Sequence, residues 1–406
     1  MTEKRSFDVV IVGGGVIGLS CAWRAAQRGA QVVVLDRGEP GSGATGVAAG
    51  MLAPVGELSF GEPRLLELTL AAAQLYPDFV AELEAASGLG TGYERLGAVH
   101  VALDRDEAAQ LRRVHGLQRS LELEAEWLPP RRCRELEPGL TPAFHGGVFA
   151  AGEAAVDPRA LTRALADACA SAGVEIRAGC EATGSIFEKG RIVGARVQKR
   201  VDDRRGQSTR VDEGRGQSTY AAADEELRAG TVVLASGAWS GAAAWLPEHA
   251  RPPVRAVKGQ VLELRRRDGE PPARHILASE RVYMVPRGDG RLIVGATVEE
   301  MGFDMAVTAG GVHELLREAY RLLPDVAEME LLDTVAGLRP GTPDNLPLVG
   351  PGAVDGLLLA TGHFRNGILL APLAAQTVAD RLSGNRRSSF PGYMPVEGRR
   401  PTEVAR

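Results

Sequence analysis

Residues 9–36 read VVIVGGGVIGLSCAWRAAQRGAQVVVLD, and this stretch constrains the fold more than any other part of the chain. An apolar run reaches three glycines, continues as a segment rich in small residues, and returns as a second apolar run that ends at Asp36. Continuous apolar runs of this length are typical of strands buried on both faces, as in parallel sheets. The stretch therefore predicts a strand, a crossover helix and a second, parallel strand.

The glycines between the two runs have the spacing of a dinucleotide-binding turn. Gly13, Gly15 and Gly18 satisfy the pattern GxGxxG. The first glycine permits the tight turn, the second lets the backbone approach a pyrophosphate at the helix N-terminus, and the third lets the helix pack closely on the strand. Asp36 ends the second run, where a carboxylate accepts hydrogen bonds from ribose hydroxyls. This context predicts a bound dinucleotide.

The rest of the sequence favours FAD over NAD. An NAD dehydrogenase would continue with regular strand–helix units, whereas residues 41–52, GSGATGVAAGML, are too irregular and too rich in glycine and alanine for a helix. Backbone of this kind can pass close to a flat ligand. Residues 362–368, GHFRNGI, predict a glycine turn at a helix N-terminus, whose positive dipole end would stabilise a reduced, anionic flavin.

Two kinds of segment alternate along the chain. Strand–helix–strand patterns occur at the N-terminus, in the middle and at the C-terminus, whereas residues 254–264, 275–286 and 291–298 indicate an antiparallel sheet. We therefore expect an α/β fold with a Rossmann-like FAD-binding domain and a discontinuous α+β substrate-binding domain on a mainly antiparallel sheet. The expected boundaries are 1–90, 145–250 and 335–406 for the first domain, and 91–144 and 251–334 for the second.

Residues 201–220 contain a tandem duplication, VDDRRGQSTR followed by VDEGRGQSTY. The unit is shorter than the repeats of solenoid proteins, which have at least about 20 residues. It is polar and contains glycine, so we expect an exposed loop or hairpin extension without a function of its own.

Composition excludes several other classes of protein. The net charge of −5 and the scattered Lys and Arg argue against a nucleic-acid partner. No run of about 18 apolar residues occurs, so we expect no transmembrane helix and a cytoplasmic protein. The four cysteines form no CxxC pair and are expected to be buried thiols, and the seven histidines show no metal-ligand spacing, so no metal is expected.

Over nearly its whole length, the chain resembles the glycine oxidases among the D-amino-acid-oxidase-like flavoproteins. The motifs that carry the resemblance are VVIVGGGVIG, AAGML, ASGAWS, VKGQ, YMVPR, GRLIVGAT, GLRPGTPDNLPLVG and GHFRNGILLAP. It implies a noncovalent FAD and a two-domain fold. The sequence departs from the family at Asp36, where many members have Glu, at Gly43 and Ala44, where larger or polar residues occur, and in the extra 201–220 segment.

The resemblance also implies roles for particular residues. The substrate carboxylate would bind Arg339, with Arg365 as a second arginine, Tyr283 over the substrate and Met51 near the small pocket. No catalytic side chain is assigned, because the hydride passes directly to the flavin. Besides the glycines at 13, 15 and 18, the implied flavin contacts are Val16, Ile17, Asp36, Arg37, Ala44, Thr45, Ala49, Gly50, Met51, Ala182, His363, Phe364, Arg365, Asn366, Gly367, Ile368 and Leu369.

The activity implied by the resemblance is oxidative deamination of glycine, and also of sarcosine and small D-amino acids. Oxygen would reoxidise the flavin, and the products would be glyoxylate or its imine, ammonia and hydrogen peroxide. The family also implies a role in thiamine thiazole biosynthesis, an imine hand-off to thiazole synthase, and a homotetramer. The alternatives are a sarcosine oxidase, a D-amino-acid dehydrogenase that reduces quinone, and a noncatalytic FAD-binding protein.

Overall fold

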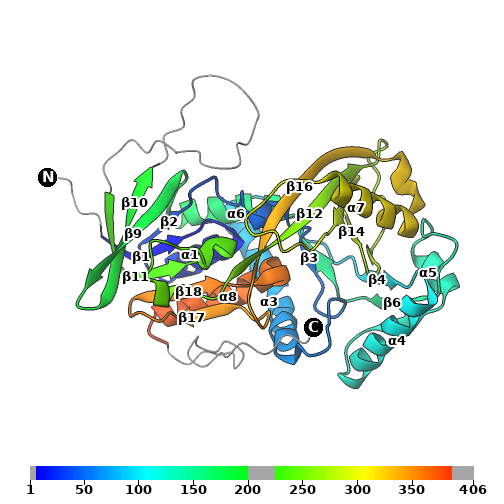
Figure 1. Ribbon diagram of the computed structural model, residues 1–406, viewed down its shortest axis with the longest axis horizontal. Helices are drawn as coiled ribbons and strands as arrows, with labels where there is room; N and C mark the ends of the chain where they lie inside the picture. The colour runs from blue at the N-terminus through cyan, green and yellow to red at the C-terminus, as the bar shows by residue number, and fades with distance from the viewer. Residues whose placement is uncertain (1–5, 200–224, 386–406) are drawn as a thin grey trace.

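The computed structural model describes residues 6–199 and 225–385. Two eight-stranded sheets lie side by side along the long axis, the first on the left and the second on the right of Figure 1. The predicted α/β fold class, with one mainly parallel and one mainly antiparallel sheet, is confirmed. The duplicated segment 201–220 and the end of the chain beyond residue 385 lie outside the described residues.

The first sheet has the order β17-β18-β11-β1-β2-β8, and β10 and β9 continue from β11. Residues 9–36 form the centre of this sheet, because their first strand, β1, pairs in parallel with both β2 and β11. The strands are β1 (Ser6–Val12), β2 (Val32–Leu35), β8 (Glu175–Arg177), β9 (Cys180–Glu188), β10 (Arg191–Lys199), β11 (Glu225–Leu234), β17 (Leu348–Pro351) and β18 (Leu357–Thr361).

Four helices pack against one face of this sheet and share a hydrophobic core with it. They are α1 (Val16–Gln27), α3 (Pro63–Ser87), α6 (Pro158–Ser171) and α8 (Gly367–Leu382). Helix α8 packs on both α1 and α3. A second core lies on the opposite face, under β9, β10 and the segment that contains the short helices η1 (Gly237–Ser240) and η2 (Glu248–Ala250).

The second sheet has the order β16-β12-β15-β14-β13-β4-β6-β5, and only β13 and β4 pair in parallel. Its strands are β4 (Ala98–Val101), β5 (Glu126–Leu128), β6 (Gly147–Ala150), β12 (Arg255–Arg265), β13 (Ile276–Ala278), β14 (Tyr283–Pro286), β15 (Arg291–Gly295) and β16 (Glu330–Gly341). The remaining helices of this half are α4 (Arg105–Ser120), α5 (Pro130–Leu136), α7 (Ala309–Leu322) and η3 (Pro324–Glu328).

Two local predictions need correction. Residues 275–286 form two strands rather than one, because the amide of Ser279 donates to the Val282 carbonyl at 2.8 Å and closes a turn between them. Residues 41–52 contain a short helix, α2 (Ala44–Val47), where no helix was expected. After it, β3 (Met51–Leu52) pairs with β7 (Ala154–Ala155).

Sheet membership bears on how the chain divides into domains. Strands β6 and β16 both belong to the second sheet. The boundary expected at residue 145 would assign β6 to the FAD-binding domain, and the boundary expected at residue 335 would cut through β16. We propose that each domain is centred on one sheet, with boundaries after β6 and after β16.

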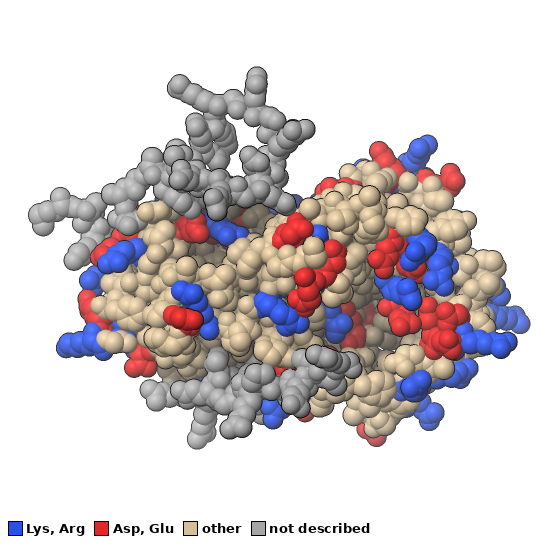
Figure 2. All heavy atoms as spheres, viewed as in Figure 1, with Lys and Arg blue, Asp and Glu red and all other residues tan. Residues whose placement is uncertain are grey.

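The surface and the cysteines agree with the composition. Acidic and basic side chains of the described residues are interspersed on the face shown in Figure 2. All four cysteines are buried and unpaired. Within the described residues, no helix combines the length and apolarity needed to cross a membrane.

Candidate FAD and substrate site

A cavity of about 1200 Å³ is lined by residues of both sheets. The first sheet contributes the turn between β1 and α1, the end of β2 and the turn after β18, and the second contributes β12, β14 and β16. The predicted site residues that line it are Gly13, Gly15, Val16, Ile17, Asp36, Arg37, Ala44, Thr45, Ala49, Gly50, Met51, Ala182, Tyr283, Arg339, His363, Phe364, Arg365, Gly367 and Ile368.

Three predicted residues do not line the cavity. Gly18 lies within α1, and a Cβ there would collide with the carbonyl of Gly13, so its role is close packing of helix on turn. Asn366 is the N-cap residue of α8, and Leu369 belongs to the core under that helix. All three support the elements that carry the lining residues.

The glycine turn is shaped by close backbone packing. Gly13 has a positive φ of 115°, and a Cβ there would collide with the Ala235 carbonyl. Gly15 is the N-cap of α1 and offers no side-chain cap, while the amide of Val16 donates to Thr45 Oγ1 at 3.1 Å. Gly15, Val16 and Ile17 at the N-terminus of α1 line the cavity, and a helix N-terminus is a suitable environment for a pyrophosphate.

Asp36 is held against the same turn. Its Oδ2 accepts a hydrogen bond from the amide of Gly14 at 2.7 Å, and its Oδ1 accepts one from Gly38 at 2.8 Å. Each carboxylate oxygen has a further lone pair for a ligand hydroxyl. The predicted contact between Asp36 and a ribose therefore fits this position.

Sequence reasoning did not single out Trp239, an aromatic residue that lines the cavity. The guanidinium of Arg37 lies over the ring of Trp239, with its Cζ 4.0 Å from the ring centroid. Trp239 in turn stacks on Phe303, with the ring centroids 6.0 Å apart. The only sequence signal was the position of Trp239 in ASGAWS, and its partners are brought to it by the fold.

A further part of the lining is the turn after β18, which leads through His363 and η4 (Phe364–Asn366) into α8. The His363 side chain is 2% exposed and its Nε2 has no hydrogen-bond partner among the described residues. Burial lowers the pKa of His363 to about 3. The imidazole is therefore neutral at ordinary pH.

The predicted substrate arginine projects from β16. Arg339 Nη1 donates to the carbonyl of Thr297 at 3.0 Å and makes a longer contact of 3.4 Å with the Lys258 carbonyl. Its guanidinium lies over Gly259 of β12, where a Cβ would collide with it. Two carbonyls and one glycine therefore set the orientation of the Arg339 fork toward the cavity.

Tyr283 faces the cavity from β14, close to Arg339. Its ring lies over Gly295 of β15, where a Cβ would also collide with it. Burial raises the pKa of Tyr283 above its usual value, and the nearby Arg339 opposes this effect. The phenol therefore stays protonated and is able to donate a hydrogen bond.

Arg365 occupies a more open position than Arg339. Its side chain is 38% exposed, and its Nη2 lies 3.8 Å from Glu62 Oε2. The structure thus brings both predicted arginines to one cavity, but of the two only Arg339 is held by the backbone carbonyls of Thr297 and Lys258.

A carboxyl group that the sequence did not single out also lines this cavity. Burial raises the pKa of Glu57, while Arg365 and Arg339 act in the opposite direction. Glu57 stands in a turn after β3, in a region with no motif or spacing that marks it. Only the fold brings it toward the two arginines.

Comparison with known proteins shows the family to which the chain belongs. The model of the family described as FAD dependent oxidoreductase (DAO) matches residues 8–381. The glycine oxidase of Geobacillus kaustophilus is 35% identical over 387 residues, which cover 94% of this chain and 93% of that protein. The glycine oxidase of Pseudomonas putida is 33% identical, with coverage of 97% and 99%.

The chain is also similar to a solved glycine oxidase structure and to longer relatives. The crystal structure of the Geobacillus kaustophilus glycine oxidase matches with a TM-score of 0.82 and 32% identity, over 95% of this chain and 96% of that one. The bifunctional protein ThiO/ThiG of Trichormus variabilis is 35% identical over 92% of this chain. This chain spans about half of that relative, 52% of its length. The chain belongs to the DAO family of FAD-dependent oxidoreductases, and FAD is its cofactor.

Proposed function

We propose that this chain is an oxidase of small amino acids, with glycine as its main substrate and sarcosine and small D-amino acids as others. The observation that carries the proposal is the position of Arg339 and Tyr283, which face the same cavity as the glycine turn, Asp36, residues 363–365 and residues 367–368. The similarity to glycine oxidases supports this choice of substrate.

The proposed roles follow from the chemistry of each group. Arg339 binds the substrate carboxylate with its planar fork, a geometry that a carboxylate matches with two hydrogen bonds. The protonated Tyr283 covers the substrate, and Met51 bounds the space for a side chain. Residues 13–18, 36–51, 182 and 363–369 hold and support FAD. When bound there, FAD would supply a hydride acceptor for the substrate Cα–H and a route for the electrons to oxygen.

Oxidation of glycine in this way gives the imine, which water converts to glyoxylate and ammonia, together with hydrogen peroxide. The names of the ThiO/ThiG relatives support a role in thiamine thiazole biosynthesis, with the imine passed to a thiazole synthase. A homotetramer and a cytoplasmic location complete the proposal.

An anaerobic reduction screen tests the proposal. The purified holoprotein is mixed with glycine, sarcosine, D-alanine and L-alanine, and the flavin absorbance is followed. We expect fast bleaching by glycine and sarcosine, slower bleaching by D-alanine, and none by L-alanine. Bleaching by sarcosine alone would favour a sarcosine oxidase, and no bleaching by any amine would favour a noncatalytic FAD-binding protein.

Oxygen consumption then separates an oxidase from a dehydrogenase. An oxidase consumes oxygen and forms peroxide with glycine at the rate of turnover. A dehydrogenase would bleach in the anaerobic screen, yet turn over only with an added quinone.

A further inference from the structure

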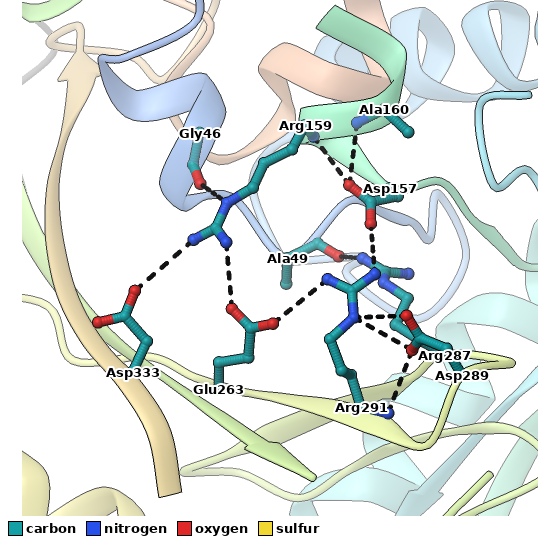
Figure 3. A network of polar contacts seen from close by, with 10 residues as sticks. All are labelled: Gly46, Ala49, Asp157, Arg159, Ala160, Glu263, Arg287, Asp289, Arg291 and Asp333. Atoms are coloured by element: carbon teal, nitrogen blue, oxygen red, sulfur yellow. Dashed lines mark hydrogen bonds and ion pairs between the residues drawn. The ribbon is translucent and has the colours of Figure 1, made fainter. Parts of the chain in front are cut away.

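A buried arginine outside the predicted site reaches the wall of the cavity. Arg287 is 8% exposed, and its Nη2 donates to the carbonyl of Ala49 at 2.5 Å (Figure 3). Ala49, Gly50 and Met51 all line the cavity. Burial lowers the pKa of Arg287 below its usual value, although Asp157 opposes this effect. A buried guanidinium is unfavourable unless it is paired, so this contact needs an explanation.

The backbone that Arg287 holds has little freedom of its own. Gly50 has a positive φ of 73°, and its carbonyl accepts a hydrogen bond from the Val156 amide at 2.9 Å. Four residues earlier, the carbonyl of Gly46 accepts a hydrogen bond from Arg159 Nε at 3.2 Å. Three carbonyls of residues 46–50 are therefore held by donors that do not line the cavity.

Arg287 is also connected through the backbone to Tyr283, the residue proposed to cover the substrate. It directly follows β14, the strand that begins with Tyr283, and its amide donates to the Arg291 carbonyl at 2.9 Å. Strand β14 pairs along its length with β15. One short hairpin of the second sheet thus carries Tyr283 at one end and the Arg287 contact at the other.

We propose that Arg287 is a positioning residue that fixes the flavin-facing backbone of residues 49–51 relative to the strand that carries Tyr283. The inference rests on the proposed function in one respect, that residues 49–51 contact the flavin. The guanidinium thereby links the FAD wall of the cavity to its substrate wall.

Arg291 provides a matched control in the same network. Its Nη2 donates to Asp157 at 2.9 Å, its Nη1 to Glu263 at 3.3 Å, and its Nε to Asp289 at 2.8 Å (Figure 3). None of these partners lines the cavity. Replacing Arg291 removes more ion pairs than replacing Arg287, but leaves the contact with Ala49 in place.

The test compares Arg287→Met and Arg291→Met as full-length proteins. The FAD dissociation constant is measured by fluorescence of released flavin, and the environment of bound flavin by its visible circular dichroism. For Arg287→Met we expect FAD binding weaker by about 10- to 100-fold, as for loss of a hydrogen bond to a charged group, and an altered flavin spectrum. For Arg291→Met we expect a lower melting temperature, an FAD constant within about twofold of the unsubstituted protein, and an unchanged spectrum.

Two outcomes would overturn the inference. One is FAD binding and a flavin spectrum in Arg287→Met that match the unsubstituted protein. The other is an equal loss in Arg291→Met, which would mean that general stability is responsible. If Arg287→Met does not fold, Arg287→Gln, whose side chain is shorter and neutral, is measured under the same criteria. These readouts need no substrate, so they stand even if the amine screen contradicts the proposed activity.

Discussion

At the scale of single residues, the orientation of Arg339 decides whether the cavity can select a carboxylate. Its Nη1 is held by the Thr297 carbonyl at 3.0 Å, so the guanidinium is oriented before any substrate arrives. Truncating one partner of a desolvated charge pair costs about 2–5 kcal/mol, or roughly 30- to 5,000-fold in kcat/KM. We expect this loss with glycine in Arg339→Met, and little rescue in Arg339→Lys, because an ammonium cannot reproduce the planar fork.

The loss should depend on the charge of the substrate. Steady-state kinetics are measured with glycine and with glycinamide, a poor substrate that lacks the carboxylate, after the flavin content of each variant is checked. Glycinamide should lose little. Equal losses on both compounds would mean that Arg339 maintains the structure of the site and does not bind the substrate carboxylate. An unchanged kcat/KM for glycine would mean that Arg365 binds the carboxylate instead.

His363 gives a prediction about pH. Burial lowers the pKa of His363 to about 3, below the value near 6.5 expected in the unfolded chain. Between these values the unfolded state binds a proton that the folded state does not, so stability falls as the pH drops from about 6.5 toward 3. The slope from this residue is at most about 1.4 kcal/mol per pH unit.

Replacing the imidazole should remove that part of the pH dependence. We expect the unfolding free energy of His363→Gln to fall less steeply than that of the unsubstituted protein between pH 6.5 and pH 4.5, measured by denaturant titration at matched FAD content. Parallel curves for the two proteins would show that His363 becomes protonated in the folded state.

At the scale of elements, strand β12 shapes the site through a residue without a side chain. A Cβ at Gly259 would collide with the Arg339 guanidinium, which is the far end of a flexible side chain and can move. We therefore expect Gly259→Ala to fold with a melting temperature near that of the unsubstituted protein, but to raise KM for glycine about tenfold or more as the fork is displaced. Unchanged kinetics would show that the fork moves without leaving the substrate.

The elements were predictable where one local pattern determines them. The glycines at 13, 15 and 18 marked β1, α1 and β2, because a tight turn and close helix packing need residues without side chains. Helix α2 was missed because four residues carry no periodicity, and its Thr45 accepts a hydrogen bond from Val16, which is distant in sequence. Helices α4 and α5 were not predicted either.

The site was predictable only in part, for a related reason. Motif residues such as Asp36 and Arg339 could be placed from their local context and from the resemblance to glycine oxidases. Glu57, Trp239 and Arg287 gain their relevance from partners on other elements, and no spacing in the sequence encodes those contacts. That the two sheets share one cavity is also a property of the tertiary fold.

At the scale of the whole molecule, acid precipitation tests whether FAD is bound noncovalently or through a covalent bond to the chain. Cys180 lines the cavity, but burial raises its pKa, so the thiol is protonated and a poor nucleophile. The other three cysteines are buried and do not line the cavity. We therefore expect acid precipitation to release all the flavin into the supernatant. Flavin that stays with the precipitated polypeptide would contradict noncovalent binding.

Removal of FAD should destabilise both halves of the molecule together. The cavity of about 1200 Å³ is lined by both sheets, so we expect a cofactor in it to contact both and to bind the folded chain but not the unfolded one. Adding FAD to the apoprotein at 100 times its dissociation constant should then stabilise it by about 2.7 kcal/mol. Calorimetry should show a single transition that moves to higher temperature as FAD is added. Two transitions, of which only one moves, would mean that FAD is held by the first sheet alone, and the second sheet would then contribute to the substrate side without contributing to cofactor binding.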